Sequence, residues 1–122
     1  MIEKRYSVAE ANALLPHLAP ALVELRERYE EAVTIRELVG AAAASNGWTD
    51  HKEEWSRTLA RVDELIERIQ TWNVLLRDVS TGLVDFPTVL EGKDAYLCWR
   101  LGEPEVAFWH FADRGFSGRM PL

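Results

Sequence analysis

The chain has 122 residues and a formal net charge of −6, from 20 acidic and 14 basic residues, and no stretch of it concentrates basic side chains. This charge argues against a dedicated nucleic-acid-binding protein, which needs a basic face against the phosphates. No run reaches the roughly 20 apolar residues of a membrane span, and the N-terminal segment lacks the continuous apolar stretch of a signal peptide. We therefore expect a cytoplasmic protein with one domain over residues 1–122, and neither a nucleic-acid nor a membrane partner.

The N-terminal region predicts a short helix that prolines interrupt. Ser7 and Glu10 have the spacing of a capping box, in which each side chain bonds the backbone amide of the other residue. A short helix should follow to about Leu15. Because Pro16 lacks an amide hydrogen and disfavours helical geometry in the residue before it, we expect a break or kink there and a restart between Pro16 and Pro20.

Two long apolar stripes then predict a pair of helices. The first runs to about residue 44, where Asn46 and Gly47 favour an end, and the second runs from about Asp50 to about Ser80. The first stripe repeats every three or four residues and the second forms two heptad columns typical of a coiled coil: Leu15, Leu18, Leu22, Leu25, Tyr29, Ala32 and Val39, then Trp55, Val62, Ile69 and Leu76 with Thr58, Leu65, Trp72 and Val79. A tight connection between such stripes favours an antiparallel helical hairpin, making a helical part at about 7–80.

After Gly82 the pattern changes to short β-branched and aromatic runs. Residues 83–90, 94–101 and 105–111 are separated by turn residues, which predicts a small three-stranded antiparallel meander within residues 82–122. Pro87 marks an edge strand or a bend, because proline cannot donate to a ladder. The expected fold class is α+β, with a short capped helix and a helical hairpin followed by this sheet.

The strands are apolar on both faces, which favours self-association. Leu97 and Trp99 alternate with Tyr96 and Cys98, so the helices can cover one face only. The helical stripes are also wider than two helices can bury in each other. A second copy of the chain would cover what one copy leaves exposed, so we expect a homodimer.

Four motifs in order along the chain resemble the bacterial family called domain of unknown function 2203. They are SVAEAN with LP near the N-terminus, GLVDFP at residues 82–87, YLCWRLGEPE at 96–105, and FWH with GFSGR at 108–119. The resemblance spans nearly the whole chain and implies its fold and setting, but no mechanism. An acidic residue usually follows the Trp-His pair in that family, where this chain has Phe111, and its absence weakens a catalytic role for His110.

The first candidate site is a metal site built from His110, Cys98 and Glu103. If the loop between the last two strands is odd and centred on Glu103, then Tyr96 lies opposite His110 and Cys98 lies on the same face. Imidazole, thiolate and carboxylate all bind transition metals, but an even loop would break this pairing and no metal-binding spacing motif is present. The structural alternative is a hydrogen-bonded histidine within the sheet, beside a small buried cysteine.

The second candidate is an anion-binding loop in the C-terminal segment ADRGFSGRMP. Two glycines beside Arg114 and Arg119 could expose amides and guanidinium groups to an anion, or the arginines could pair with acids such as Asp85 or Asp113. The full set of candidate ligand-binding residues is Asp85, Arg100, His110, Asp113, Arg114 and Arg119. We expect no catalytic residue, because no serine has a nucleophile-elbow setting and burial should raise the pKa of the single cysteine, Cys98.

The sequence therefore favours a non-enzymatic, homodimeric interaction or scaffold domain and names no cofactor. The alternative is a protein that binds a small anionic ligand or a metal, or an enzyme, with its site at the C-terminal sheet and the Gly/Arg tail. Convergence of the polar residues on one concave pocket would favour a ligand site. Isolated pairs around the rim of the sheet would favour the scaffold.

Overall fold

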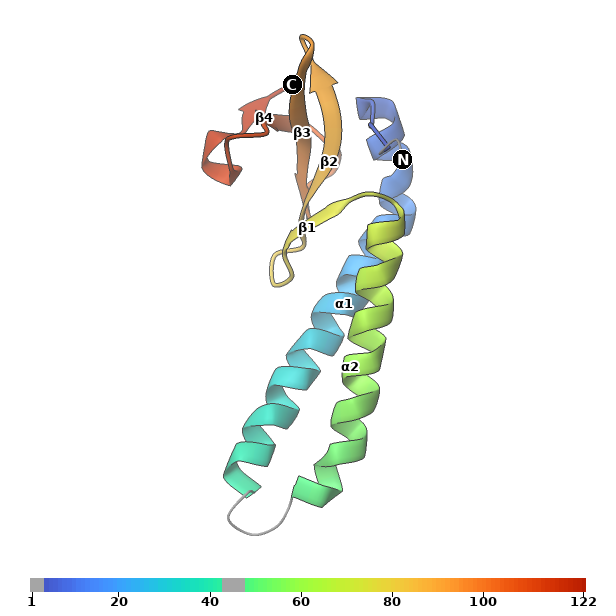
Figure 1. The fold of residues 1–122 in the computed structure, drawn as a ribbon, viewed down its shortest axis with the longest axis vertical. Helices are drawn as coiled ribbons and strands as arrows, with labels where there is room; N and C mark the ends of the chain where they lie inside the picture. The colour runs from blue at the N-terminus through green and yellow to red at the C-terminus, as the bar shows by residue number, and fades with distance from the viewer. Residues whose placement is uncertain (1–3, 43–47) are drawn as a thin grey trace.

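A computed structural model of the protein describes the backbone of residues 4–42 and 48–122, and the side chains of residues 4–38 and 51–122. Over these residues the chain forms two α-helices followed by a five-stranded antiparallel sheet whose strands are neighbours in chain order (Figure 1). The elements are α1 (Val8–Ala42), α2 (Trp48–Thr71), β1 (Leu75–Asp78), β2 (Leu83–Leu90), β3 (Lys93–Arg100), β4 (Phe108–Phe111), the 3₁₀ helix η2 (Phe116–Gly118) and β5 (Met120–Pro121). The α+β class is confirmed.

The prediction of a separate short first helix is wrong, because α1 continues through both prolines. Its start is as expected: the Glu10 amide donates to Ser7 Oγ at 3.1 Å and the Ser7 amide donates to a Glu10 carboxylate oxygen at 3.0 Å. Pro16 and Pro20 are exposed and lie four residues apart. Both prolines therefore lie toward solvent, where water can replace a missing backbone bond, and the helix continues.

The second helix ends well before Ser80, so its predicted end is wrong. Asn73 adopts a left-handed backbone with a φ of 57°, and the amides of Trp72 and Asn73 bond carbonyls three residues earlier. This geometry closes the helix after Thr71. Leu76 and Val79, which continue the heptad columns, lie in β1 and in the turn after it. Their spacing fitted a helix by coincidence.

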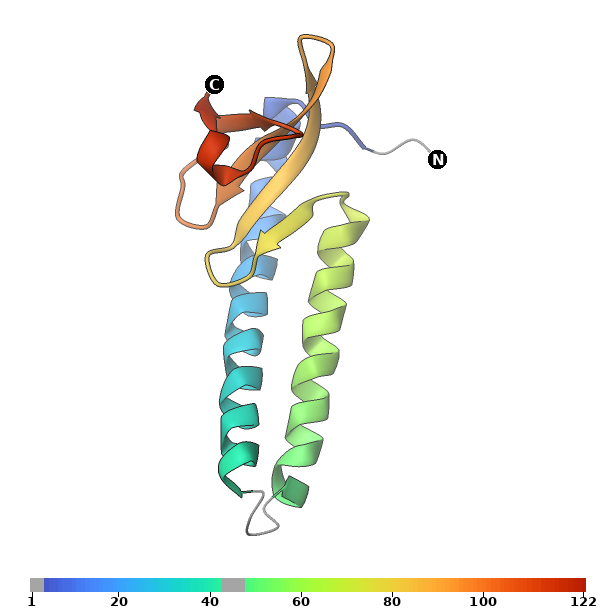
Figure 2. The same cartoon turned by 60° about the vertical axis from the view of Figure 1, so that its left-hand side comes forward.

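The two helices lie side by side and run in opposite directions (Figures 1 and 2). Arg61 of α2 joins them by donating to both carboxylate oxygens of Glu24 on α1, at 2.5 and 2.6 Å. The predicted helix end at Asn46 and Gly47, and the tight connection of a hairpin, lie outside the described residues.

The sheet contains the three predicted strands and two that were not predicted, so the three-stranded meander is too small. The register between β3 and β4 is the odd one, with Tyr96 opposite His110 and Cys98 opposite Phe108. Pro87 lies in β2, which has neighbours on both sides, but β1 pairs only with the first three residues of β2. Beyond β1, the amide of Tyr6 donates to the Pro87 carbonyl at 2.7 Å, so Pro87 occupies an edge-like position.

One face of the sheet packs on the helices and completes the hydrophobic core (Figure 2). Val84, Phe86, Leu97 and Trp99 lie on this inner face, and all are at most 3% exposed. The core cluster joins them to the N-terminal half of α1, the C-terminal half of α2 and Tyr6. The opposite, outer face is therefore free to carry other chemistry. No helix within residues 4–42 and 48–122 is long and apolar enough to cross a membrane.

Candidate metal centre

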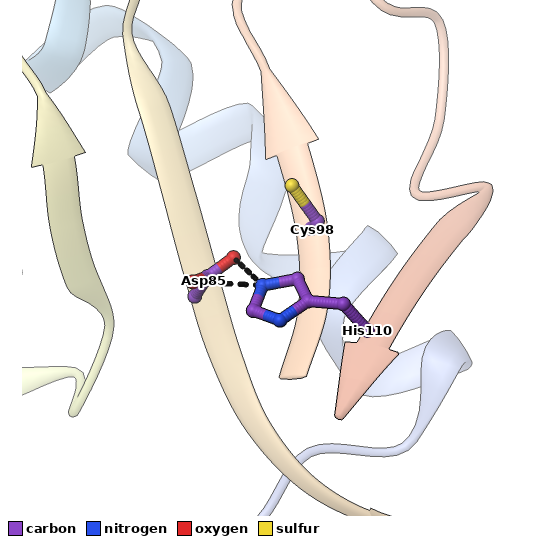
Figure 3. Close-up of side chains that lie close together, drawn as sticks. All are labelled: Asp85, Cys98 and His110. Atoms are coloured by element: carbon purple, nitrogen blue, oxygen red, sulfur yellow. Dashed lines mark hydrogen bonds and ion pairs between the residues drawn. The ribbon is translucent and has the colours of Figure 1, made fainter. Parts of the chain in front are cut away.

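Three polar side chains gather on the outer face, one from each of three neighbouring strands. Asp85 on β2 lies opposite Cys98 on β3, while His110 on β4 lies opposite Tyr96. Alternation along the strands puts all three side chains on the face away from the helices. Figure 3 shows the imidazole of His110 reaching across β3 to the carboxylate of Asp85, with the sulfur of Cys98 beside it.

Asp85 and His110 form a buried pair whose side chains are each 4% exposed. Nε2 of His110 lies 3.1 Å from both carboxylate oxygens of Asp85. Nδ1 lies 2.9 Å from the backbone carbonyl oxygen of Phe111. Since a carbonyl oxygen can only accept, Nδ1 carries a hydrogen.

The hydrogen on Nδ1 restricts what can lie between Nε2 and the Asp85 carboxylate. A neutral imidazole with its hydrogen on Nδ1 would direct the Nε2 lone pair at the two Asp85 oxygens, and the contact would be repulsive. A positive charge between Nε2 and the carboxylate removes the repulsion. Either a proton or a metal cation can supply it.

Cys98 completes a possible ligand set. Nε2 of His110, a carboxylate oxygen of Asp85 and the Cys98 sulfur all lie within 4.8 Å of one another. Burial, followed by the negative charge of Asp85, raises the pKa of the Cys98 thiol to about 12. The thiol is therefore protonated and inert at neutral pH, as expected from its place in a strand. A bound cation would reverse this, because a coordinating thiol loses its proton.

Arg77 of β1 is the member of this cluster that the sequence did not reveal. Its Nε donates to an Asp85 oxygen at 2.8 Å, and this hydrogen bond holds the pKa of Arg77 above its ordinary value. The ladder between β1 and β2 shifts register between Leu76 and Asp78, which leaves Arg77 unpaired in the strand. Because the sequence pattern predicted a helix over residues 74–80, Arg77 was not among the candidate site residues. The available signal was the polar Asn73, at the position that Ile66 and Leu59 occupy one and two heptads earlier.

A cavity of about 410 Å³ opens above the Asp85–His110 pair. Its lining residues are Arg77, Leu83, Asp85, Cys98, His110, Ala112, Asp113, Arg114, Gly115 and Phe116. Most of the candidate polar residues therefore converge on one pocket, which is the arrangement that favours a ligand site. Arg100, Glu103 and Arg119 are not among its lining residues.

Glu103, expected as a metal ligand, lies outside this cluster and anchors the tail. Its carboxylate accepts two bonds from Arg119 Nη2, at 2.9 and 2.8 Å, and one from the Arg100 amide at 2.8 Å. The guanidinium of Arg119 lies between the rings of Phe108 and Phe116, at 3.9 and 4.8 Å from their centres. Arg119 is therefore committed to folding the tail onto the sheet, and its partner is neither of the expected acids.

The position after the Trp-His pair faces away from this cluster. The rings of Phe111 and Trp109 are stacked edge to face at 4.7 Å, which puts Phe111 on the opposite side of β4 from His110. An acidic residue at position 111 would point to that other side. Phe111 in place of an acid thus removes nothing from the cluster around His110.

The motifs that carry the family resemblance mostly close the fold. The Asn12 side chain of α1 accepts from the Val106 amide at 2.7 Å, and the Trp99 indole donates to the Glu103 carbonyl at 3.0 Å. No curated protein and no solved structure matches this chain. A family model described as "uncharacterized conserved protein" matches residues 4–122. The chain therefore belongs to the family of uncharacterised conserved proteins called DUF2203.

Proposed function

We propose that this protein binds one divalent transition metal ion through the Asp85 carboxylate, the Cys98 thiolate and Nε2 of His110. The proposal rests on the hydrogen-bond count at His110, whose Nδ1 is committed to a backbone carbonyl while Nε2 faces a carboxylate. Metal-binding histidines characteristically donate their second ring nitrogen to a carbonyl or a carboxylate in this way. The bond from Arg77 to Asp85 supplies the matching support for the carboxylate ligand.

The chemistry of the three groups favours zinc, or cobalt in its place. Nitrogen, sulfur and oxygen donors from His, Cys and Asp are the ligands of tetrahedral zinc. Three protein ligands leave a fourth position, as in zinc sites where the ion meets a small molecule. Here that position would face the cavity, which also supplies a route for the ion.

The alternative is a structural ion pair with a proton at Nε2. His110 would then be an imidazolium bonded to Asp85, with Arg77 as the second cation on the same carboxylate. This arrangement stabilises the outer face but needs neither Cys98 nor a metal. The two alternatives therefore differ in metal binding.

The test is a titration of chelator-treated protein with Zn²⁺ and Co²⁺. We expect one ion per chain, and a thiolate-to-cobalt charge-transfer band that disappears in Cys98→Ser. Asp85→Asn and His110→Ala should weaken binding at least 10- to 100-fold, the usual cost of disturbing a metal's ligand environment. His17→Ala, a change of an exposed histidine on α1, is the matched control and should bind as the wild type does. Circular dichroism of each variant would check its fold. Failure of the wild type to bind either ion, or equal binding by His110→Ala and His17→Ala, would refute the proposal.

We also propose that the protein is a homodimer whose interface lies on the helices beyond the sheet. Among the residues whose side chains are described, the core that the sheet completes takes residues of α1 up to Leu25 and residues of α2 from Val62. Beyond these limits Tyr29, Val33 and Leu59 are 45%, 41% and 36% exposed. A second helix pair would cover them and make a four-helix bundle, consistent with an interaction or scaffold role. Light scattering that finds a monomer at concentrations on the order of 10 μM, where typical interfaces are occupied, would refute this proposal.

A further inference from the structure

We propose that the open position of this metal centre takes the carboxylate of a small acid with a short apolar chain, and that Arg114 pairs with its negative charge. This inference rests on the proposed metal site. It assigns a ligand class to the cavity above that site.

The charge of the cavity favours an anion. A divalent ion bound by the Asp85 carboxylate, the Cys98 thiolate and a neutral His110 has no net charge. The remaining charged side chains that line the cavity are Arg77, Arg114 and Asp113. Their sum is one positive charge, so a ligand with one negative charge would neutralise the cavity.

Of the two arginines, Arg114 is the one available to a ligand. Arg77 already donates to Asp85 and lies 5.2 Å from the centre of the Tyr96 ring. Across the part of the chain whose side chains are described, Arg114 forms no ion pair. A guanidinium presents a fork of donors that matches a carboxylate.

The tail holds Arg114 in place at the cavity. The Arg114 amide donates to the Phe111 carbonyl at 3.0 Å, which closes the turn after β4. The backbone of Gly118 lies so close that a Cβ there would come within 2.9 Å of the Arg114 Cβ. Because Arg119 anchors the tail to Glu103 just beyond Gly118, the turn that carries Arg114 is fixed from both ends.

The other walls of the cavity determine the rest of the ligand. Leu83, Ala112 and Phe116 line it together with the polar groups. A volume of about 410 Å³ lies within the usual range for small-molecule pockets and holds more than a bare inorganic anion. A small acid would bind the metal through its carboxylate and pack its short hydrocarbon chain against the apolar walls.

The experiment uses the cobalt-loaded protein and a pair of probes that differ in charge. Butyrate and butyramide have nearly the same shape, and only butyrate is an anion. We expect butyrate to shift the visible cobalt spectrum in a saturable manner, and butyramide at the same concentrations to leave it unchanged. Both titrations are made at constant ionic strength, since exposed charges are screened by salt.

Arg114→Gln should weaken butyrate binding about tenfold, the usual size of one hydrogen bond to a charged group. Its cobalt spectrum without butyrate should match that of the wild type, which shows that the metal site and fold are intact. Arg57→Gln on α2 is the matched control, because it removes the same charge from an exposed arginine that does not line the cavity, and it should bind butyrate normally.

The outcomes separate this inference from the metal site itself. A cobalt spectrum that butyrate does not move, an equal response to butyramide, or equal affinities in Arg114→Gln and Arg57→Gln would refute the carboxylate site alone. Absence of any cobalt spectrum would refute the metal centre, and the carboxylate site with it.

Discussion

Both faces of strands β2 to β4 hold buried side chains, and they differ in what buries them. On the inner face, Phe86 and Leu97 are fully buried in the hydrophobic core that the sheet shares with the helices. On the outer face, Asp85 and His110 are covered by each other, by Arg77 and by the rim of an open cavity. Alternation along each strand thus separates a surface that provides stability from one that can provide chemistry.

This division has an experimental consequence. A substitution on the inner face should change the free energy of unfolding and leave the site intact in each folded molecule. A substitution on the outer face should change binding more than it changes stability. The two faces can therefore be distinguished by measuring both quantities for each variant.

The largest effect on stability is expected from Phe86→Ala on the inner face. The Phe86 ring is fully buried and stacks edge to face on Tyr6 at 5.1 Å. Removing it leaves a cavity in the core and should lower the free energy of unfolding by about 3–5 kcal/mol. Urea denaturation measures this loss, and a loss below about 1 kcal/mol would contradict the role given to the inner face. Metal stoichiometry per folded chain, measured in the cold, should remain that of the wild type.

Much of the sheet could be predicted from the sequence, because local pattern determines it. Residues 83–90, 94–101 and 105–111 match β2, β3 and β4 with small errors at the ends, since alternating runs bounded by glycine turns define strands locally. Two kinds of strand were missed. Leu75–Asp78 continued the spacing of the helix before it, and Met120–Pro121 is too short to have a pattern.

Strand register allowed only part of the candidate site to be predicted from the sequence. An odd loop centred on Glu103 put Cys98 and His110 on one face, because a register determines the facing of every residue in both strands. Asp85 was proposed as a ligand-binding residue. Its contact with His110 was not predicted, because it reaches from β2 across β3 to β4. The role of Glu103 could not be predicted, since its partner Arg119 meets it only after the tail folds back.

Asp85→Asn on the outer face should give the next largest effect on stability. The side chain keeps its shape but loses the charge that both Arg77 and His110 face. Leaving the buried His110 and the half-exposed Arg77 without a charged acceptor should cost about 2 kcal/mol, which urea denaturation can measure. Metal affinity per folded chain should fall as well, whereas in Phe86→Ala it should not change.

The matched control for Asp85→Asn is Asp94→Asn. Asp94 lies on β3 and pairs with Arg5, but its side chain is 67% exposed. Exposed ion pairs contribute little, so this variant should stay within about 0.5 kcal/mol of the wild type. Equal losses in the two variants would mean that the network on the outer face has no special importance.

A smaller effect is expected from Arg119→Lys, which tests how the tail covers the outer face. Lysine keeps the positive charge but loses the planar group that lies between Phe108 and Phe116 and the paired bonds to Glu103. We expect a loss of about 1 kcal/mol. Arg57→Lys, a change of an arginine on α2 that is 72% exposed, is the control and should have no measurable effect on thermal unfolding. If the two variants melt alike, the tail is held by other contacts.

The smallest effect is expected at the start of α1, where Glu10 touches neither face of the sheet. The hydrogen bond from Lys4, followed by that from the Ser7 amide, lowers the pKa of Glu10 from 4.5 to about 2. A carboxyl group with a lowered pKa contributes stability above its unfolded value, and that contribution disappears as the pH falls from about 4.5 to about 2. Wild type and Glu10→Gln should therefore differ slightly at pH 7 and converge at pH 2 in thermal unfolding.

Metal affinity at pH 7 allows Glu10→Gln to be compared with the variants on the two faces of the sheet. Glu10 is exposed and lies at the helix terminus, so Glu10→Gln should bind metal as the wild type does. A plot of metal affinity against the free energy of unfolding compares the three variants. If the stability of the fold alone controlled metal binding, Glu10→Gln, Phe86→Ala and Asp85→Asn would all fall on one line. Separation of Asp85→Asn from that line is the result expected if the outer face holds the ion itself.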